Sequence, residues 1–183
     1  LHARQWAQIG PPLRPAPDDL AICEAEVTRW TTRSGRAPRV LLLGATPELA
    51  SMAWPTGTSL VAIDRTRAML GAVFPDEAGP ALVGDWRALP VRDRAFDWIV
   101  GDGCATLLDY PAGYASVATE LRRVLADDGE LALRLFAAPE LPEPLLDIAR
   151  DLAANRIGNV HVLKWRLAMA IQPPSRNVRV SEI

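Results

Sequence analysis

Short apolar segments that stop at a glycine or an aspartate constrain the fold of this chain more than any other feature. Four of them, at residues 40–43, 59–63, 81–83 and 96–100, have the hydrophobicity expected of strands buried on both faces. Predicted helices separate them, and strand–helix–strand alternation requires right-handed crossovers between parallel strands. The sequence therefore predicts an α/β fold with a mostly parallel sheet and helices on both of its faces.

The remaining segments complete this alternation. We predict helices over residues 18–34, 47–52, 65–72, 114–125, 142–155 and 160–171, and a fifth strand over 130–136 after an Asp128-Gly129 turn. A strand is the alternative for 160–171, but its apolar residues recur at helical spacing. A proline-rich segment covers residues 10–17, and residues 1–9 could form a short helix.

The residues that follow the first four strands give the main functional signal. Gly44, Asp64, Asp85 and Asp102 each stand at the carboxyl end of a predicted strand. In parallel sheets these ends meet at one edge, and ligands bind there near the point where the strand order reverses. We therefore expect a ligand site at this edge.

The turn after the first strand indicates what kind of ligand binds. Gly44 can bring the backbone close to a ligand, and Pro47 suits the first position of a helix capped by Thr46. A dinucleotide would place its pyrophosphate here, where the carboxylate of Glu48 opposes it. A cofactor with an ammonium and a sulfonium group and no phosphate fits better, which favours S-adenosylmethionine. The alternative is that Thr46 and Glu48 only cap the helix.

Asp64, at the end of the second strand, is placed to accept hydrogen bonds from both hydroxyls of a ribose. This spacing alone fits NAD enzymes equally well.

Longer motifs separate the two possibilities. AIDRTRAML (62–70) resembles the segment after the second strand of class I S-adenosylmethionine-dependent methyltransferases. VGDWRALPVRDRAFDWIVGDGCATLL (83–108) and TELRRVLADDGELALRLF (119–136) are similar to the later motifs of the same family. The resemblance covers roughly residues 40–136, in order and with matching spacing. It implies a Rossmann-like fold, S-adenosylmethionine as cofactor, and methyl transfer to a small molecule by in-line displacement.

The resemblance also implies roles on the adenosine side. Asp64 would bind the ribose hydroxyls, while Arg65 and Met69 would flank the adenine. Asp85 would accept a hydrogen bond from the adenine amino group, with Trp86 beside the ring. Met69 and Trp86 could instead be packing residues, and Asp85 part of a simple turn.

On the methionine side, the resemblance places Gly44 and Ala45 against the cofactor, with Asp102 and Gly103 near its amino group. The first motif departs from the family pattern, because Leu42 replaces the usual acidic residue, and Thr46 and Glu48 occupy later glycine positions. We hypothesise that Glu48 replaces the missing acid. The usual final antiparallel hairpin is not evident before Ile183, which suggests a truncated chain or inserted helices.

The sequence therefore predicts three segments of one domain. They are an N-terminal helical cap or lid (1–38), the cofactor-binding core (39–136) and a C-terminal helical segment on the substrate side (137–183).

No catalytic residue is assigned, because methyl transfer needs mainly alignment of the reactants. Asp102, Tyr110 and Tyr114 are close enough in sequence to act as a base, although a cofactor contact and packing explain them more simply. The acceptor is expected to contact the N-terminal segment with Trp6 and Arg14 and the last helices.

Composition excludes several classes of function. The net charge of −2 and the lack of a basic stripe argue against nucleic acid and anionic membranes as partners. No apolar run is long enough to span a bilayer, and no signal peptide is visible. Isolated cysteines and two histidines argue against a metal site and favour reduced thiols in a cytoplasmic protein. The oligomeric state is open.

Two other functions remain open at this stage. One is an NAD-dependent oxidoreductase, which the weak glycine pattern and Glu48 oppose. The other is a methyltransferase-like subunit that binds the cofactor, or nothing, and acts in regulation or assembly. The irregular first motif supports this second alternative.

Overall fold

The computed structural model describes residues 6, 9–137 and 139–171. It divides into two compact units, and each is described by itself. The larger unit contains Arg14–Leu135 together with Trp6. The smaller unit contains Ile9–Leu13 and the described residues from 136 to 171. The predicted scheme has one domain and starts its last segment at residue 137, next to the boundary between the units.

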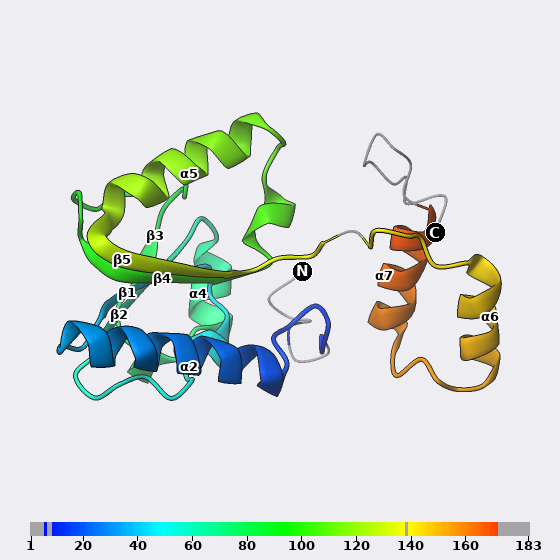
Figure 1. The fold of residues 1–183 in the computed structure, drawn as a ribbon. Helices are drawn as coiled ribbons and strands as arrows, with labels where there is room; N and C mark the ends of the chain where they lie inside the picture. Colours follow the sequence, from blue (N-terminus) through cyan, green and yellow to red (C-terminus); the bar gives the residue numbers. More distant parts are fainter. Residues whose placement is uncertain (1–5, 7–8, 138, 172–183) are drawn as a thin grey trace. The chain divides into compact units, whose positions relative to one another are not determined.

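The larger unit is built on a five-stranded parallel sheet (Figure 1). Its strands are β1 (Arg39–Leu43), β2 (Ser59–Asp64), β3 (Ala81–Val83), β4 (Phe96–Asp102) and β5 (Leu125–Arg134). Their order is β3-β2-β1-β4-β5, so β1 pairs with β2 on one side and with β4 on the other. The strand order therefore reverses between β1 and β4, which is where a ligand crevice forms in such sheets.

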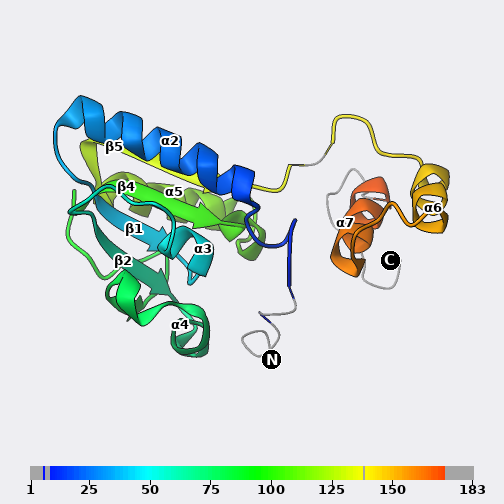
Figure 2. The same cartoon turned by 90° about the horizontal axis from the view of Figure 1, so that it is seen from below.

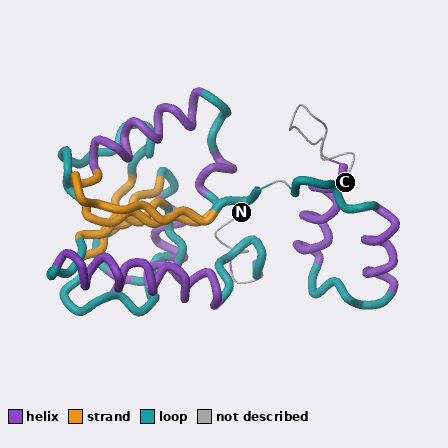
Figure 3. Tube along the Cα trace, viewed as in Figure 1, coloured by secondary structure: helices purple, strands orange, loops and turns teal. Residues whose placement is uncertain are grey.

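Helices cover both faces of this sheet (Figures 1 and 3). They are α2 (Pro17–Ser34), α3 (Pro47–Ala50), α4 (Arg67–Val73) and α5 (Ala112–Val124), with short 3₁₀ helices at Asp76–Ala78 and Cys104–Leu107. Val40 and Leu42 of β1 pack in one core cluster with residues of α2 and α4. Leu41 and Leu43 pack in a second cluster with residues of α5. The unbroken apolar run of β1 thus serves both faces, and the predicted α/β fold is confirmed.

The segment before β5 differs from its prediction. The sequence predicted that Asp128-Gly129 turns the preceding helix into a strand, whereas β5 already begins at Leu125. Its pairing with β4 moves from Phe96↔Leu125 to Trp98↔Glu130, so residues 126–129 bulge. At Gly129 a Cβ atom would lie 2.7 Å from Leu125 Cδ1, so any other residue would force the Leu125 side chain to move.

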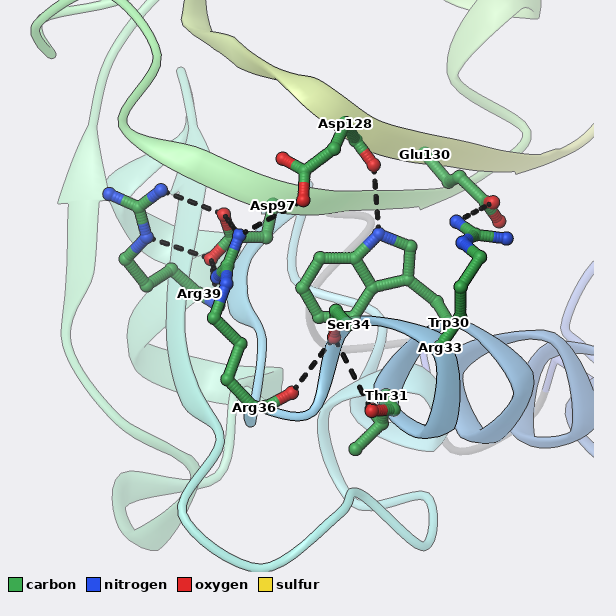
Figure 4. Close-up of polar contacts among 9 residues, drawn as sticks. All are labelled: Trp30, Thr31, Arg33, Ser34, Arg36, Arg39, Asp97, Asp128 and Glu130. Carbon is green, nitrogen blue, oxygen red and sulfur yellow. Dashed lines mark hydrogen bonds and ion pairs between the residues drawn. The ribbon is translucent and has the colours of Figure 1, made fainter.

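A charged cluster fixes the opposite end of the sheet from the strand ends discussed above (Figure 4). Asp97 of β4 is fully buried and accepts from the backbone N–H of Arg39 at 2.9 Å. The Arg39 guanidinium binds the same carboxylate through Nε and Nη2, both at 2.7 Å, and Arg36 binds it at 2.8 Å. Trp30 Nε1 donates to the carbonyl of Asp128 at 2.9 Å, which ties α2 to the β5 bulge. Because these partners all favour the ionised form, the pKa of Asp97 lies well below its usual value despite burial.

The smaller unit contains two helices, α6 (Leu145–Ala153) and α7 (Val160–Ile171). The helix predicted over residues 160–171 is confirmed, while α6 begins later and ends earlier than the predicted 142–155. The Trp165 ring stacks on Phe136 with centroids 4.6 Å apart, and Arg166 forms ion pairs with Glu143 and Asp151. Among the described residues after β5, the chain forms no further strand. The short helix expected over residues 1–9 lies largely outside the described residues.

None of the described helices combines the length and the apolar character that a membrane span requires.

Candidate functional site

The structure brings the predicted strand-end residues to one edge of the sheet. Gly44 follows β1, Asp64 ends β2, Asp85 follows β3 and Asp102 ends β4. These strands are neighbours and run parallel, so their carboxyl ends lie together (Figure 2). Gly44 and Asp102 stand on the two sides of the point where strand order reverses.

Gly44 forms the floor between Asp64 and Trp86. Its φ of 97° is in the region that only glycine adopts without strain, and its N–H donates to the carbonyl of Ile63 at 2.9 Å. A Cβ atom on Gly44 would lie 3.8 Å from Asp64 Oδ2 and 3.8 Å from Trp86 Cζ2. A side chain at this position would therefore stand against both Asp64 and Trp86.

Asp64 uses one carboxylate oxygen within the protein. Oδ1 accepts from the backbone N–H of Thr66 at 2.7 Å, which fixes the carboxylate at the start of α4. Oδ2 is the oxygen that lies toward Gly44. A carboxylate held through one oxygen can offer the other to a pair of hydroxyl groups.

The residues expected around an adenine follow β2 and β3: Met69 lies in α4, and the others lie in the loops after the two strands. Asp85 is bound by its neighbour Arg87, through Nη2 at 2.6 Å and through the backbone N–H at 2.9 Å. These bonds to Arg87, with a smaller contribution from Arg65, lower the pKa of Asp85 to about 2. Trp86 Nε1 donates to the carbonyl of Ile63 at 2.7 Å, and its ring packs against the second core cluster. Met69 packs in part against the first cluster.

Asp102 is the most buried carboxylate of this edge, with 4% of its side chain exposed. Its Oδ1 accepts from Arg134 Nε at 2.6 Å. Burial raises the pKa of Asp102; Arg134 opposes this effect, whereas the charges of Glu48 and Asp19 add to it. The next residue, Gly103, has a φ of 63°, and its N–H donates to the carbonyl of Arg134 at 3.0 Å. The nearly buried Asp102 carboxylate is thus neutralised in part by Arg134.

The turn into α3 presents one carboxylate. Glu48 Oε1 accepts from Arg14 Nε at 2.5 Å. Glu48 Oε2 is buried, and no described residue gives it a hydrogen bond. Ala45 and Thr46 are both buried. Thr46 stands at the N-cap position, as predicted, but its side chain makes no capping bond.

Arg134 was missed by the sequence analysis. It is the last residue of β5, so the rule that located Gly44, Asp64 and Asp102 applies to it as well. The sequence signal was therefore present, but the strand was predicted to end at residue 136, which placed Arg134 in its interior instead of at its end.

Two tyrosines follow the site along the chain. The rings of Tyr110 and Tyr114 meet edge to face with centroids 5.4 Å apart. Tyr110 is 74% exposed and Tyr114 is 40% exposed, so neither is a core packing residue. Tyr110 precedes α5, and Tyr114 lies in its first turn.

The carboxylates at this edge fit an adenosine compound with a positively charged end. Asp64 can accept from ribose hydroxyls, and both Glu48 and Asp102 favour a cation. A pyrophosphate at the start of α3 would meet Glu48. Among the described residues, no three histidine, cysteine or acidic side chains are placed to hold a metal ion.

Comparison with known proteins identifies the fold. No family model matches the chain, and no curated protein matches its sequence. The structure is similar to the PH0226 protein from Pyrococcus horikoshii OT3, with 20% identity and a TM-score of 0.53 over 70% of this chain and 64% of that one. A predicted S-adenosyl-L-methionine-dependent methyltransferase from Methanococcus maripaludis is 17% identical, with a TM-score of 0.57 over 92% of this chain and 75% of that one.

A third similar structure is S-adenosylmethionine-bound CalS10, an amino pentose methyltransferase from Micromonospora echinaspora. It is 21% identical, with a TM-score of 0.53, and the match covers 67% of this chain and 52% of CalS10. The chain thus spans less than two thirds of PH0226 and of CalS10. At these identities the similarity shows the fold: the chain has the Rossmann-like fold of class I S-adenosylmethionine-dependent methyltransferases.

Proposed function

We propose that this chain binds S-adenosylmethionine at the carboxyl edge of its sheet and transfers a methyl group to a small-molecule acceptor. The observation that carries the proposal is the position of Asp64 Oδ2 beside Gly44, next to the reversal of strand order. When bound, the cofactor supplies a methyl group activated by a sulfonium.

In this proposal, the adenosine is held on the β2 and β3 side. Asp64 accepts from the ribose hydroxyls, and Asp85 accepts from the adenine amino group. Arg65, Met69 and Trp86 lie around the base. Met69 and Trp86 each pack in part against a core cluster, which keeps their side chains in place before binding.

The methionine end is held on the β1 and β4 side. The backbone of residues 44–46 approaches it, and Asp102 with Gly103 lies near its amino group. Glu48 supplies the carboxylate that the family pattern places at the position of Leu42. The buried, unpartnered Oε2 supports this role.

The transfer itself depends on alignment of the acceptor with the methyl group and the sulfur, which can supply about 7–11 kcal/mol. Asp102 is bound to Arg134, so we assign it a binding role rather than that of a base. The exposed Tyr110 and Tyr114 are our candidates for acceptor recognition. The acidic composition favours a small molecule over a nucleic acid, and the two free cysteines favour the cytoplasm.

Calorimetry with S-adenosylmethionine, S-adenosylhomocysteine and NAD tests the cofactor. We expect binding of the two sulfur compounds and none of NAD. Transfer of a radiolabelled methyl group to pooled small molecules then tests the reaction. Preference for NAD, or no binding of any of the three, would overturn the proposal.

A non-catalytic cofactor-binding subunit is the second candidate. It is favoured by the irregular turn, in which Thr46 and Glu48 replace glycines. The Glu48 carboxylate also already forms an ion pair with Arg14. Tight binding of S-adenosylmethionine without transfer to any acceptor pool would favour this candidate.

A further inference from the structure

The carboxylate of Asp85, to which the proposed function assigns the base of the cofactor, is already bound by an arginine. Arg87 Nη2 donates to Asp85 Oδ2 at 2.6 Å, and Arg87 Nε donates to Oδ1 at 3.0 Å. The contact is therefore bidentate, which is the strongest arrangement of a guanidinium and a carboxylate. The side chain of Arg87 is 50% exposed and that of Asp85 is 42% exposed, so a ligand can reach the pair. A base that approaches Asp85 therefore meets Arg87 as well.

The backbone holds these two side chains together before any ligand binds. The N–H of Ala88 donates to the carbonyl of Asp85 at 3.0 Å and closes a tight turn, in which the N–H of Arg87 donates to Asp85 Oδ1 at 2.9 Å. An aspartate that accepts from the backbone two residues later stabilises such a turn. The N–H of Gly84 donates to the carbonyl of Asp64 at 3.1 Å, so the turn begins beside the proposed ribose-binding residue. The Asp85–Arg87 pair is therefore an ordered part of the ligand edge of the sheet.

The pair offers hydrogen-bond donors and acceptors side by side. An ionised carboxylate only accepts, and a guanidinium only donates. The bonds from Arg87 lower the pKa of Asp85 to about 2, so near neutral pH the carboxyl group stays ionised and supplies no donor of its own. Arg87 Nη1 forms no hydrogen bond with any residue that the structure describes, so its N–H groups are available to a ligand. A ligand therefore finds acceptors on Asp85 and donors on Arg87.

Purine bases differ at the edge that such a pair would meet. A 6-aminopurine carries an exocyclic N–H donor beside a ring nitrogen that accepts, whereas a 6-oxopurine carries an exocyclic oxygen acceptor beside a ring N–H that donates. A carboxylate alone matches the amino group, but it offers no donor to the oxo group, and an unmatched polar group is costly. A donor and an acceptor together can match either base.

We propose that Arg87 determines the base specificity of the cofactor site, so that the site binds thioethers of 6-aminopurine and 6-oxopurine nucleosides with similar affinity. This inference rests on the proposed function and deepens it. With a 6-aminopurine, Asp85 accepts from the amino group. With a 6-oxopurine, Asp85 accepts from the ring N–H and Arg87 donates to the oxo group. The ribose and the methionine end are the same in both compounds, so the two differ only at the edge that meets this turn.

Calorimetry with S-adenosylhomocysteine and S-inosylhomocysteine, its 6-oxo counterpart, tests this specificity. For the unmodified protein we expect affinities that differ by less than about threefold, because each base finds a partner for both of its edge groups. Arg87→Met removes the donors and keeps an unbranched side chain. It should weaken binding of S-inosylhomocysteine about tenfold or more while changing that of S-adenosylhomocysteine less than about threefold. Arg87→Lys keeps a charged donor and should recover part of the lost affinity.

Arg92→Met is the matched control, because Arg92 is an exposed arginine later in the same loop. It should bind both compounds as the unmodified protein does, and a thermal melt checks that each variant folds. A preference of the unmodified protein for S-adenosylhomocysteine greater than about threefold would overturn the inference and leave the proposed function standing. An equal effect on both compounds in a folded Arg87→Met protein would also overturn it, since that result is expected if the ion pair only stabilises the turn. Failure to bind S-adenosylhomocysteine would overturn the proposed function itself.

Discussion

Arg134 Nε lies 2.6 Å from Asp102 Oδ1, so the last residues of β5 and β4 are tied side chain to side chain at the ligand edge of the sheet. Arg134 also lies 3.8 Å from Asp19 near the start of α2. Of these two carboxylates, that of Asp102 is almost completely buried, whereas that of Asp19 is partly exposed. Its charge is thus balanced in part by one arginine and remains sensitive to a further cation.

This arrangement predicts that S-adenosylmethionine binding releases protons at mildly acidic pH. The pKa of Asp102 is raised above 3.8 in the free protein, mainly by burial. A cationic ligand lowers that pKa, so affinity should fall as the pH drops from neutral toward 3.8. Calorimetry in buffers with different heats of ionisation measures the released protons.

Asp102→Asn should abolish this proton release while keeping a hydrogen-bond acceptor for Arg134. Affinity that is constant from neutral pH down to the acid limit of folding would contradict the assignment of Asp102 to the cofactor site.

Asp64→Asn should weaken binding of S-adenosylhomocysteine about tenfold to a hundredfold, because charged hydrogen bonds contribute about 1.5–3 kcal/mol. The asparagine carbonyl can still accept from the Thr66 N–H, so the fold should be preserved. Isothermal titration measures the loss, and a thermal melt checks the fold. Asp109→Asn, at an exposed position after β4, serves as the control and should bind normally. Equal affinities for Asp64→Asn and the control would remove Asp64 from the site.

Asp97→Asn should destabilise the larger unit by about 2–3 kcal/mol, as it removes a buried charge that two arginines bind. The arginines are 44% and 40% exposed, so water can hydrate them and keep the loss moderate. Urea unfolding measures it. Asp127→Asn, which affects an exposed ion pair, should change stability by less than about 0.5 kcal/mol.

The same substitution has a pH signature. The pKa of Asp97 is lowered in the folded protein, so its contribution is complete above the unfolded value of 3.8 and is lost as the pH falls below it. The difference between the unmodified protein and Asp97→Asn should therefore shrink below pH 3.8. A difference that stays constant into strong acid would show that the carboxylate charge is not what stabilises this end of the sheet.

Trp86 should report ligand binding by its fluorescence, because its ring borders Gly44 and Asp64. Trp86→Phe should remove most of the emission change caused by S-adenosylhomocysteine. It should also lower stability by about 1 kcal/mol through loss of the bond to the Ile63 carbonyl. Trp30→Phe, at the other end of the sheet, should leave the emission change intact. Persistence of the full change in Trp86→Phe would place the ligand elsewhere.

The sheet could be predicted because its signal is local. β1 must be apolar on both faces, and Leu41 and Leu42 do enter different core clusters. Parallel strands then place their carboxyl ends together, so Gly44, Asp64 and Asp102 followed from the strand assignments alone. The roles of individual site residues toward a cofactor remain predictions.

What could not be predicted depends on contacts between distant segments. The β5 bulge is fixed by Trp30, which lies in α2 and binds the Asp128 carbonyl. The partnership of Arg14 with Glu48 joins residues with no local relation in sequence, and so does that of Arg134 with Asp102. Periodicity carries no information about such pairs.

The position of the Asp97 cluster has a practical consequence for redesign. It anchors the amino ends of β1 and β4, whereas the loops proposed to select cofactor and acceptor leave the carboxyl ends. Substitutions at the two ends share no partners, so their effects on the free energy of unfolding should add. Acceptor loops can then be diversified in a library whose members all keep the same stabilising anchor.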